Sequence, residues 1–167
     1  MTNDELLEKI KLSMIDYYSG DPKRIHHFIK VHSFAKLIGG LEKLDSNEMF
    51  VLECAALVHD IGIKPAEEKY ASSSGKYQEA EGGKPAAELL RGLGVSEDVV
   101  NRVCYLVSHH HTYNMIDGAD YQILVESDFI VNLYEDNVKP DGIRNALKNI
   151  FKTHGGITVA RKCFGIS

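Results

Sequence analysis

Hydrophobic residues along the chain recur mostly at the three- and four-residue spacing of an α-helix, and the alternation typical of strands is almost absent. This spacing predicts one helix over residues 4–19 and a second that starts at Asp21-Pro22, a good N-cap and first-turn pair, and runs to residue 38. A third predicted helix, over residues 46–58, is apolar on nearly every side. A helix of that kind is normally buried, so we expect it at the centre of the fold.

The rest of the chain predicts four more helices after one long irregular stretch. Residues 62–83 lose the helical spacing and contain glycines, a proline and three consecutive serines, which predicts a loop with a short helical piece that acts as a lid or specificity loop. Beyond it we expect helices over residues 85–91, 96–110, 121–134 and 141–153. The sequence therefore predicts an all-α protein of six to seven helices, forming one compact domain over residues 1–167.

Composition and charge narrow the class of protein. A chain of 167 residues with 44% hydrophobic content has enough apolar surface for a single core. The three cysteines are odd in number and widely separated, which favours reduced thiols and a cytoplasmic location. We expect no signal peptide and no membrane-spanning segment. A net charge of -5 without a basic stripe argues against binding to extended nucleic acid, which favours a small-molecule partner.

Candidate metal chemistry is centred on His59 and Asp60, an adjacent imidazole and carboxylate at the end of the third predicted helix. His27, His110 and Asp128 lie on the apolar faces of three other predicted helices. An ionised carboxylate in a buried position needs a compensating cation or hydrogen bonds, and a metal ion held by all of these groups would provide the cation. Nitrogen and oxygen ligands suit divalent Mn, Fe, Zn, Ni, Co or Mg, so the identity of the metal stays open.

Four of these candidate ligands lie in three short motifs: His27-Phe28-Ile29-Lys30-Val31, His59-Asp60-Ile61-Gly62 and Glu126-Ser127-Asp128-Phe129. In this order they resemble the HD-domain metal-dependent phosphohydrolase superfamily. The resemblance covers about residues 21–135 and leaves the predicted helices over residues 4–19 and 141–153 outside it. It implies a helical fold in which His27, His59, Asp60 and Asp128 bind a divalent cation.

The resemblance leaves the number of ions open. Members with two metals add histidines between the second and third motifs, and His109 and His110 are similar to the later pair. The earlier histidine has no counterpart, and Glu79 is the nearest residue that could replace it. Either Glu79, His109 and His110 complete a second site, or one metal binds and Glu79 is a base or a bystander.

The activity that the resemblance implies is hydrolysis of a phosphate ester on a small phosphorylated compound, with a nucleotide as one candidate. Asp60 would orient the attacking water, and His109 or His110 would offset charge as the leaving group departs. Lys30 lies within one helical turn of His27, and Lys64 follows Asp60 closely. Of these two lysines, Lys64 is the better candidate to hold a phosphate oxygen.

Two other classes of function stay open at this point. Some proteins that share this fold hold two irons and activate dioxygen, and in a regulatory or structural module the metal would only join helices while a nucleotide or protein binds without turnover. We expect His26, His32 and His154 at the surface or beside the ligands, not as ligands. The helices over residues 4–19 and 141–153 would either complete the core or form the contact of a homo-oligomer.

Overall fold

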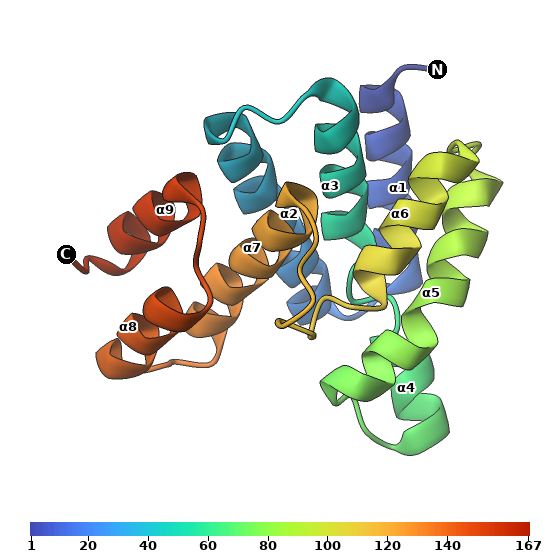
Figure 1. Cartoon of the computed structure of the whole chain (residues 1–167). Coiled ribbons are helices and arrows are strands. Elements are labelled where there is room, and N and C mark those ends of the chain that lie inside the picture. Colours follow the sequence, from blue (N-terminus) through green and yellow to red (C-terminus); the bar gives the residue numbers. More distant parts are fainter.

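In the computed structural model, which describes residues 1–167, the chain forms nine α-helices and no strands (Figure 1). The helices are α1 (Asn3–Tyr17), α2 (Pro22–Leu41), α3 (Ser46–Val58), α4 (Ile63–Tyr70), α5 (Gly75–Gly92), α6 (Glu97–Val107), α7 (Ala119–Glu135), α8 (Pro140–Asn149) and α9 (His154–Phe164). The predicted all-α class is confirmed, with more helices than the six to seven expected. None of the helices is both long enough and apolar enough to cross a membrane.

The central position predicted for the third helix is confirmed by α3. Every residue from Phe50 to Val58 is buried, because α3 packs against α1, α2, α6 and α7. The helix begins with a capping box in which Asp45 accepts a hydrogen bond from the backbone N–H of Glu48, and Glu48 accepts one in return. Its C-terminal end therefore delivers the next residues, His59 and Asp60, into the interior of the fold.

The prediction of a loop over residues 62–83 is wrong, because this segment is mostly helical. It contains all of α4 and the first half of α5, joined by a short connection that starts at Ala71 in the left-handed conformation, with φ of 53°. The helix predicted over residues 85–91 is the last part of α5, and Pro85 does not end it. The glycines and prolines suggested breaks, but the packing of α5 along α4 and α6 outweighs these local preferences.

The prediction of one final helix over residues 141–153 is also wrong. α8 ends at Asn149, and α9 follows after Thr153, whose side chain accepts a hydrogen bond from the backbone N–H of Gly156 at 2.9 Å. Two consecutive glycines at the start of α9 give a weak helix signal. Gly156 is nevertheless required here, because a Cβ at this position would overlap the carboxylate of the fully buried Glu126 in α7.

The turn that follows α3 is held in place by the end of α1. The Tyr17 hydroxyl donates a hydrogen bond to the carbonyl of Ile61 at 3.0 Å, and the buried Tyr18 hydroxyl donates to the carbonyl of Asp60 at 2.7 Å. Two tyrosines from a helix far away in sequence therefore fix the backbone on which Asp60 is carried.

Gly62 fixes the same turn against α5. A Cβ on Gly62 would overlap the carbonyl oxygen of Gln78 and lie 2.9 Å from Cα of Gly82. Gly82 is equally confined, because a Cβ there would lie 2.7 Å from a methyl group of Val107 in α6. The glycine in His59-Asp60-Ile61-Gly62 thus allows α5 to approach the turn closely.

Candidate metal centre

Four side chains from α2, α7 and the turn after α3 converge on one point. Nε2 of His27 lies 3.1 Å from Oδ2 of Asp60 and 3.1 Å from Oδ1 of Asp128. Nε2 of His59 lies 3.3 Å from Nε2 of His27 and 3.4 Å from each of the same two carboxylate oxygens. The structure thus brings together the four residues that the sequence motifs imply as ligands.

These separations fit a shared cation. Donor atoms bound about 2.1 Å from one metal ion, at angles of about 90–110°, lie about 3.0–3.4 Å from one another. The donor set of two imidazole nitrogens and two carboxylate oxygens suits divalent transition metals. His59 is fully buried and Asp128 is 3% exposed, so charge at this point is shielded from water and needs compensation inside the protein.

Hydrogen bonds on the outer atoms of the ligands set their orientation. Nδ1 of His27 bonds to Oε1 of Glu135 at 2.6 Å, and Nδ1 of His59 donates to a backbone carbonyl in α3 at 2.7 Å. Asn132 donates to Oδ1 of Asp128 at 3.1 Å, one turn away on the same helix. With both Nδ1 atoms occupied, each imidazole turns Nε2 toward the centre, as in metal sites where a carboxylate or carbonyl orients the histidine.

The electrostatics of the cluster favour positive charge at its centre. Burial alone would lower the pKa of both imidazoles, but hydrogen bonds to Asp128 and Asp60 raise the pKa of His27 to about 11, and the charge of Asp60 raises the pKa of His59 to about 10. Burial would raise the pKa of Asp60 and of Asp128, yet the histidines hold the pKa of each carboxyl below its usual value. The carboxylates therefore stay ionised and attract protons or a metal cation.

A second group of donors lies on the other side of Asp60. Its Oδ1 atom is 3.5 Å from Nε2 of His110, and His111 offers a further nitrogen within the same group. His110 is buried, its Nδ1 donates to the carbonyl of Val107 at 2.8 Å, and its Nε2 has no hydrogen-bond partner. Buried polar atoms are rarely left unpaired, and a cation bound to Asp60 would satisfy this one. Asp60 thus offers one oxygen to each group of donors.

The structure does not bring the other expected site residues into either group. Glu79 instead accepts a hydrogen bond from the hydroxyl of Thr112 at 2.9 Å. His109 stacks on Tyr105 and bonds to its carbonyl, because successive residues near a helix end point in different directions. Lys64 donates to a backbone carbonyl at the end of α1 at 3.3 Å and does not line the cavity over the ligands.

Gln78, the residue before Glu79, contacts the second group of donors through His111. Its Oε1 atom bonds to Nε2 of His111 at 3.0 Å, and its Nε2 donates to the carbonyl of Ser73 at 2.6 Å. Burial, helped by the neighbouring His110, lowers the pKa of His111 to about 4, which keeps this imidazole neutral. The sequence reasoning missed Gln78 because the segment was expected to be a loop, where a helical face cannot be assigned.

The remaining histidines lie away from both groups. His26 and His154 are exposed. His32 is 8% exposed and bonds to Glu53 of α3 at 3.0 Å, while Lys36 lies 3.5 Å from the same carboxylate. This second cluster, in which His32 and Glu53 are buried and Lys36 is exposed, joins α2 to α3 and does not touch the candidate metal centre.

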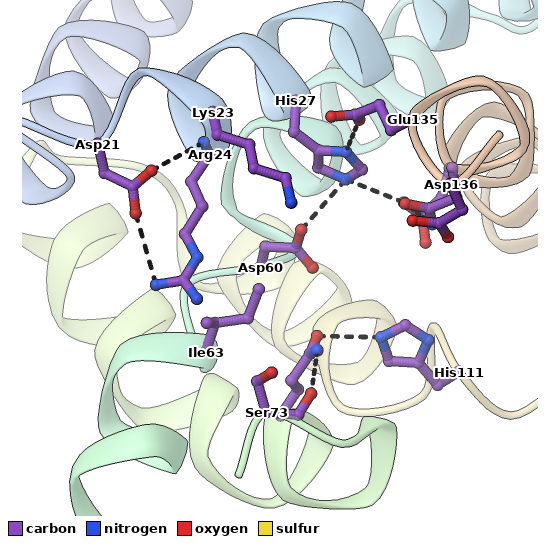
Figure 2. A pocket seen from close by; sticks show the side chains of 13 residues that line it. Asp21, Lys23, Arg24, His27, Asp60, Ile63, Ser73, His111, Glu135 and Asp136 are labelled. Atoms are coloured by element: carbon purple, nitrogen blue, oxygen red, sulfur yellow. Dashed lines mark hydrogen bonds and ion pairs between the residues drawn. The ribbon is translucent and has the colours of Figure 1, made fainter. Parts of the chain in front are cut away.

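A cavity of about 510 Å³ opens beside the cluster (Figure 2) and is lined by three of the four residues, His27, Asp60 and Asp128, whereas His59 lies behind them. Lys23 and Arg24, from the first turn of α2, form part of its wall. Arg24 is paired with Asp21 and Glu67, whereas Lys23 makes no ion pair. Neither residue was predicted from the sequence as part of the site, although Lys23 precedes His27 by four residues and so lies on the same face of the helix.

Comparison with known proteins agrees with this geometry. The model of the HD domain family matches residues 24–154, which include every residue of both donor groups. The chain belongs to the HD domain family. The match is longer than the predicted 21–135 at its C-terminal side, and it leaves α1 outside the part of the HD domain that is matched.

One solved structure is similar to this HD domain over most of its length. It is the crystal structure of a protein described as a predicted HD superfamily hydrolase from an uncultured Thermotogales bacterium, with 24% sequence identity and a TM-score of 0.64. The similarity covers 97% of this chain and 84% of the other chain, and at this level of identity it shows a common fold. No curated protein matches the chain.

Proposed function

We propose that this HD domain is a metal-dependent phosphohydrolase that acts on a small phosphorylated compound. The observation that carries the proposal is a cluster beside the cavity in which Nε2 of His27 and Nε2 of His59 each lie 3.1–3.4 Å from a carboxylate oxygen of Asp60 and of Asp128. Membership of the HD domain family supports the same conclusion.

The four converging residues would hold one divalent cation, and Asp60, His110 and His111 could hold another. When bound, such a cation supplies Lewis acidity, which acidifies water and polarises a phosphoryl oxygen. Either number of ions is compatible with the proposed reaction, because Asp60 belongs to both donor groups.

The protein's own residues have separate tasks in this reaction. Asp60, held ionised by its histidine neighbours, accepts a hydrogen bond from the attacking water and orients it. The bond between phosphorus and the ester oxygen breaks as the water oxygen bonds to phosphorus, and a proton from the water ends on the leaving alcohol. If the second donor group binds no cation, His110, whose unpaired Nε2 faces Asp60, is the imidazole best placed to carry that proton.

The test is phosphate release from a panel of phosphomonoesters, including p-nitrophenyl phosphate, in the presence of each divalent metal in turn. We expect His27→Ala and Asp128→Ala to lose about 100-fold or more in kcat/KM, because each removes a proposed ligand. His26→Ala is the matched control for His27→Ala, since it removes an exposed imidazole next to the ligand and should leave kcat/KM unchanged.

Other outcomes would contradict the proposal. Two bound irons with substrate-dependent oxygen consumption and no phosphate release would favour the oxygenase alternative. Tight binding of a nucleotide or protein without turnover would favour a regulatory module.

A further inference from the structure

The cavity over the candidate metal centre differs in composition from a site for a nucleobase. Of the 13 residues that line it, only Ile63 is hydrophobic, and none is Phe, Tyr or Trp. Pockets for drug-like ligands are lined mainly by apolar and aromatic side chains, and bases bind proteins largely by stacking on aromatic rings. This cavity offers hydrogen-bonding groups where a base would need a flat apolar surface.

Of the lysine and arginine side chains that line this cavity, one has no ion-pair partner. Lys23 extends into the cavity and makes no ion pair (Figure 2). Arg24, the other cationic residue of the wall, is already held by Asp21 and Glu67. A single unpaired ammonium is suited to one phosphate group, as a point charge.

The opposite wall comes from the end of α7 and is acidic and polar. Asp136 lines it without an ion-pair partner, and Asn132 and Glu135 lie beside it. Carboxylates and amides accept hydrogen bonds from hydroxyl groups, and the negatively charged carboxylates repel additional phosphates. On the side of α5, Ser73 and Gln78 add further polar groups.

We infer that the substrate is a phosphomonoester of a small hydroxyl-rich compound, of the sugar phosphate class, and not a nucleotide. Lys23 binds its phosphate and the α7 wall binds its hydroxyl groups. A cavity of about 510 Å³ has the size of an ordinary small-molecule site. This inference rests on the proposed function, because it places the phosphate beside the metal ligands.

The test compares ribose 5-phosphate with adenosine 5′-monophosphate, which share the phosphate and the ribose ring and differ in the base. We expect kcat/KM for ribose 5-phosphate to be at least about tenfold higher, and ribose 5-phosphate to bind the metal-loaded protein more tightly in calorimetry. Lys23→Met should raise KM for ribose 5-phosphate and weaken binding of inorganic phosphate, each by about tenfold. Lys9→Met removes an exposed charge on α1 that does not line this cavity, and should change neither value.

Equal or better turnover and binding of the nucleotide would overturn the inference, as would an unchanged KM and phosphate affinity in Lys23→Met. If no phosphomonoester is hydrolysed with any metal, the proposed function fails. The calorimetric preference between ribose 5-phosphate and the nucleotide then decides the inference on its own.

Discussion

Glu135 supports the candidate metal centre without facing the position of the cation. Its carboxylate bonds to the outer nitrogen of His27 at 2.6 Å, and Lys30 lies 3.8 Å from its other oxygen. Lys30 was the weaker of the two lysines considered from the sequence for contact with a phosphate, and it pairs with this supporting carboxylate and does not line the cavity. The orientation of His27 is therefore set by the last turn of α7.

The contact between Glu135 and His27 can be tested by substitution. Glu135→Gln should weaken divalent metal binding by about 10- to 100-fold, because the partner of a metal-binding histidine fixes its ring and raises its basicity. Metal affinity can be measured by calorimetry. Glu88→Gln, at an exposed position on α5, serves as the control and should bind metal like the unmodified protein. Equal affinities in the two variants would show that Glu135 does not support the ligand.

The second prediction is a pH dependence of stability from the cluster of His32, Lys36 and Glu53. Burial would raise the pKa of Glu53, but the hydrogen bond with His32 and the charge of Lys36 lower it below its ordinary value of 4.5. A carboxyl with a lowered pKa in the folded protein stabilises it above that ordinary value, and the stabilisation is lost as the pH falls through the folded-state pKa.

Glu53→Gln should therefore lower the free energy of unfolding by about 1–2 kcal/mol at neutral pH. The difference from the unmodified protein should shrink as the pH falls below about 4. Urea unfolding at several pH values measures it. A difference that stays constant down to acidic pH would mean that the Glu53 charge does not contribute.

At the residue scale, the proposed ligands were predictable because each is a polar residue on an apolar helical face or at its end. His27 and Asp128 stand out for this reason, and His59-Asp60 for its adjacency. The position of Lys23 on the same helix face as His27 was visible in the sequence. Exposed lysines are so common, however, that this position alone does not identify a binding residue. Nothing in the sequence showed that Lys64 would turn toward α1.

Among the elements, the turn between α3 and α4 determines where the Asp60 carboxylate lies. It is confined by α1 through two tyrosine hydroxyls and by α5 through the absence of a side chain at Gly62. α1 lies outside the residues matched by the HD domain family, so part of this support is contributed by a helix that the family match does not include.

A prediction at this scale is that Gly62→Ala destabilises the protein by about 1–3 kcal/mol, because the added methyl group must displace the α5 backbone. Gly40→Ala is the matched control. Nothing lies within 4 Å of a Cβ at Gly40, and alanine favours a helix over glycine by up to about 1 kcal/mol. Chemical denaturation compares the two variants, and a neutral Gly62→Ala would contradict the close packing of α5.

Tyr18→Phe tests the contribution of α1. Loss of the hydroxyl should cost about 1 kcal/mol of stability and weaken metal binding by up to about tenfold, because the carbonyl of Asp60 loses its donor. Tyr134→Phe, at an exposed position of α7, should change neither quantity. If Tyr18→Phe loses stability but keeps full metal affinity, the hydrogen bond supports the fold and not the ligand.

The elements could be predicted from the sequence where apolar residues recur at helical spacing, as in α2, α6 and α7, or fill the whole segment, as in α3. These four helices carry the proposed ligands or end just before them. α5 and α9 were missed or shortened because each contains consecutive glycines, which lower helix propensity. These glycines serve contacts with distant residues, such as Gly82 with Val107 and Gly156 with Glu126. Such contacts are tertiary, so local sequence preference could not reveal them.

At the scale of the whole molecule, the arrangement of the helices explains why residues as far apart in sequence as 27 and 135 contribute to one candidate metal centre. α3 crosses the core, and α2, α6 and α7 pack around it, so that their polar residues meet at one end of α3 (Figure 1). α8 and α9 lie on the α7 side, and the buried Glu126 bonds to the backbone N–H groups of Lys152 and Thr153 at 2.9 and 3.0 Å. The predicted single domain over residues 1–167 remains a prediction, as does a homo-oligomer.

The most direct test of the central claim is a crystal structure of the protein loaded with manganese or zinc, with anomalous scattering measured at the absorption edge of the metal. The account predicts an ion bound jointly by His27, His59, Asp60 and Asp128, and its loss in Asp128→Asn. A saturating metal that binds elsewhere and leaves these four side chains without an ion would contradict the account.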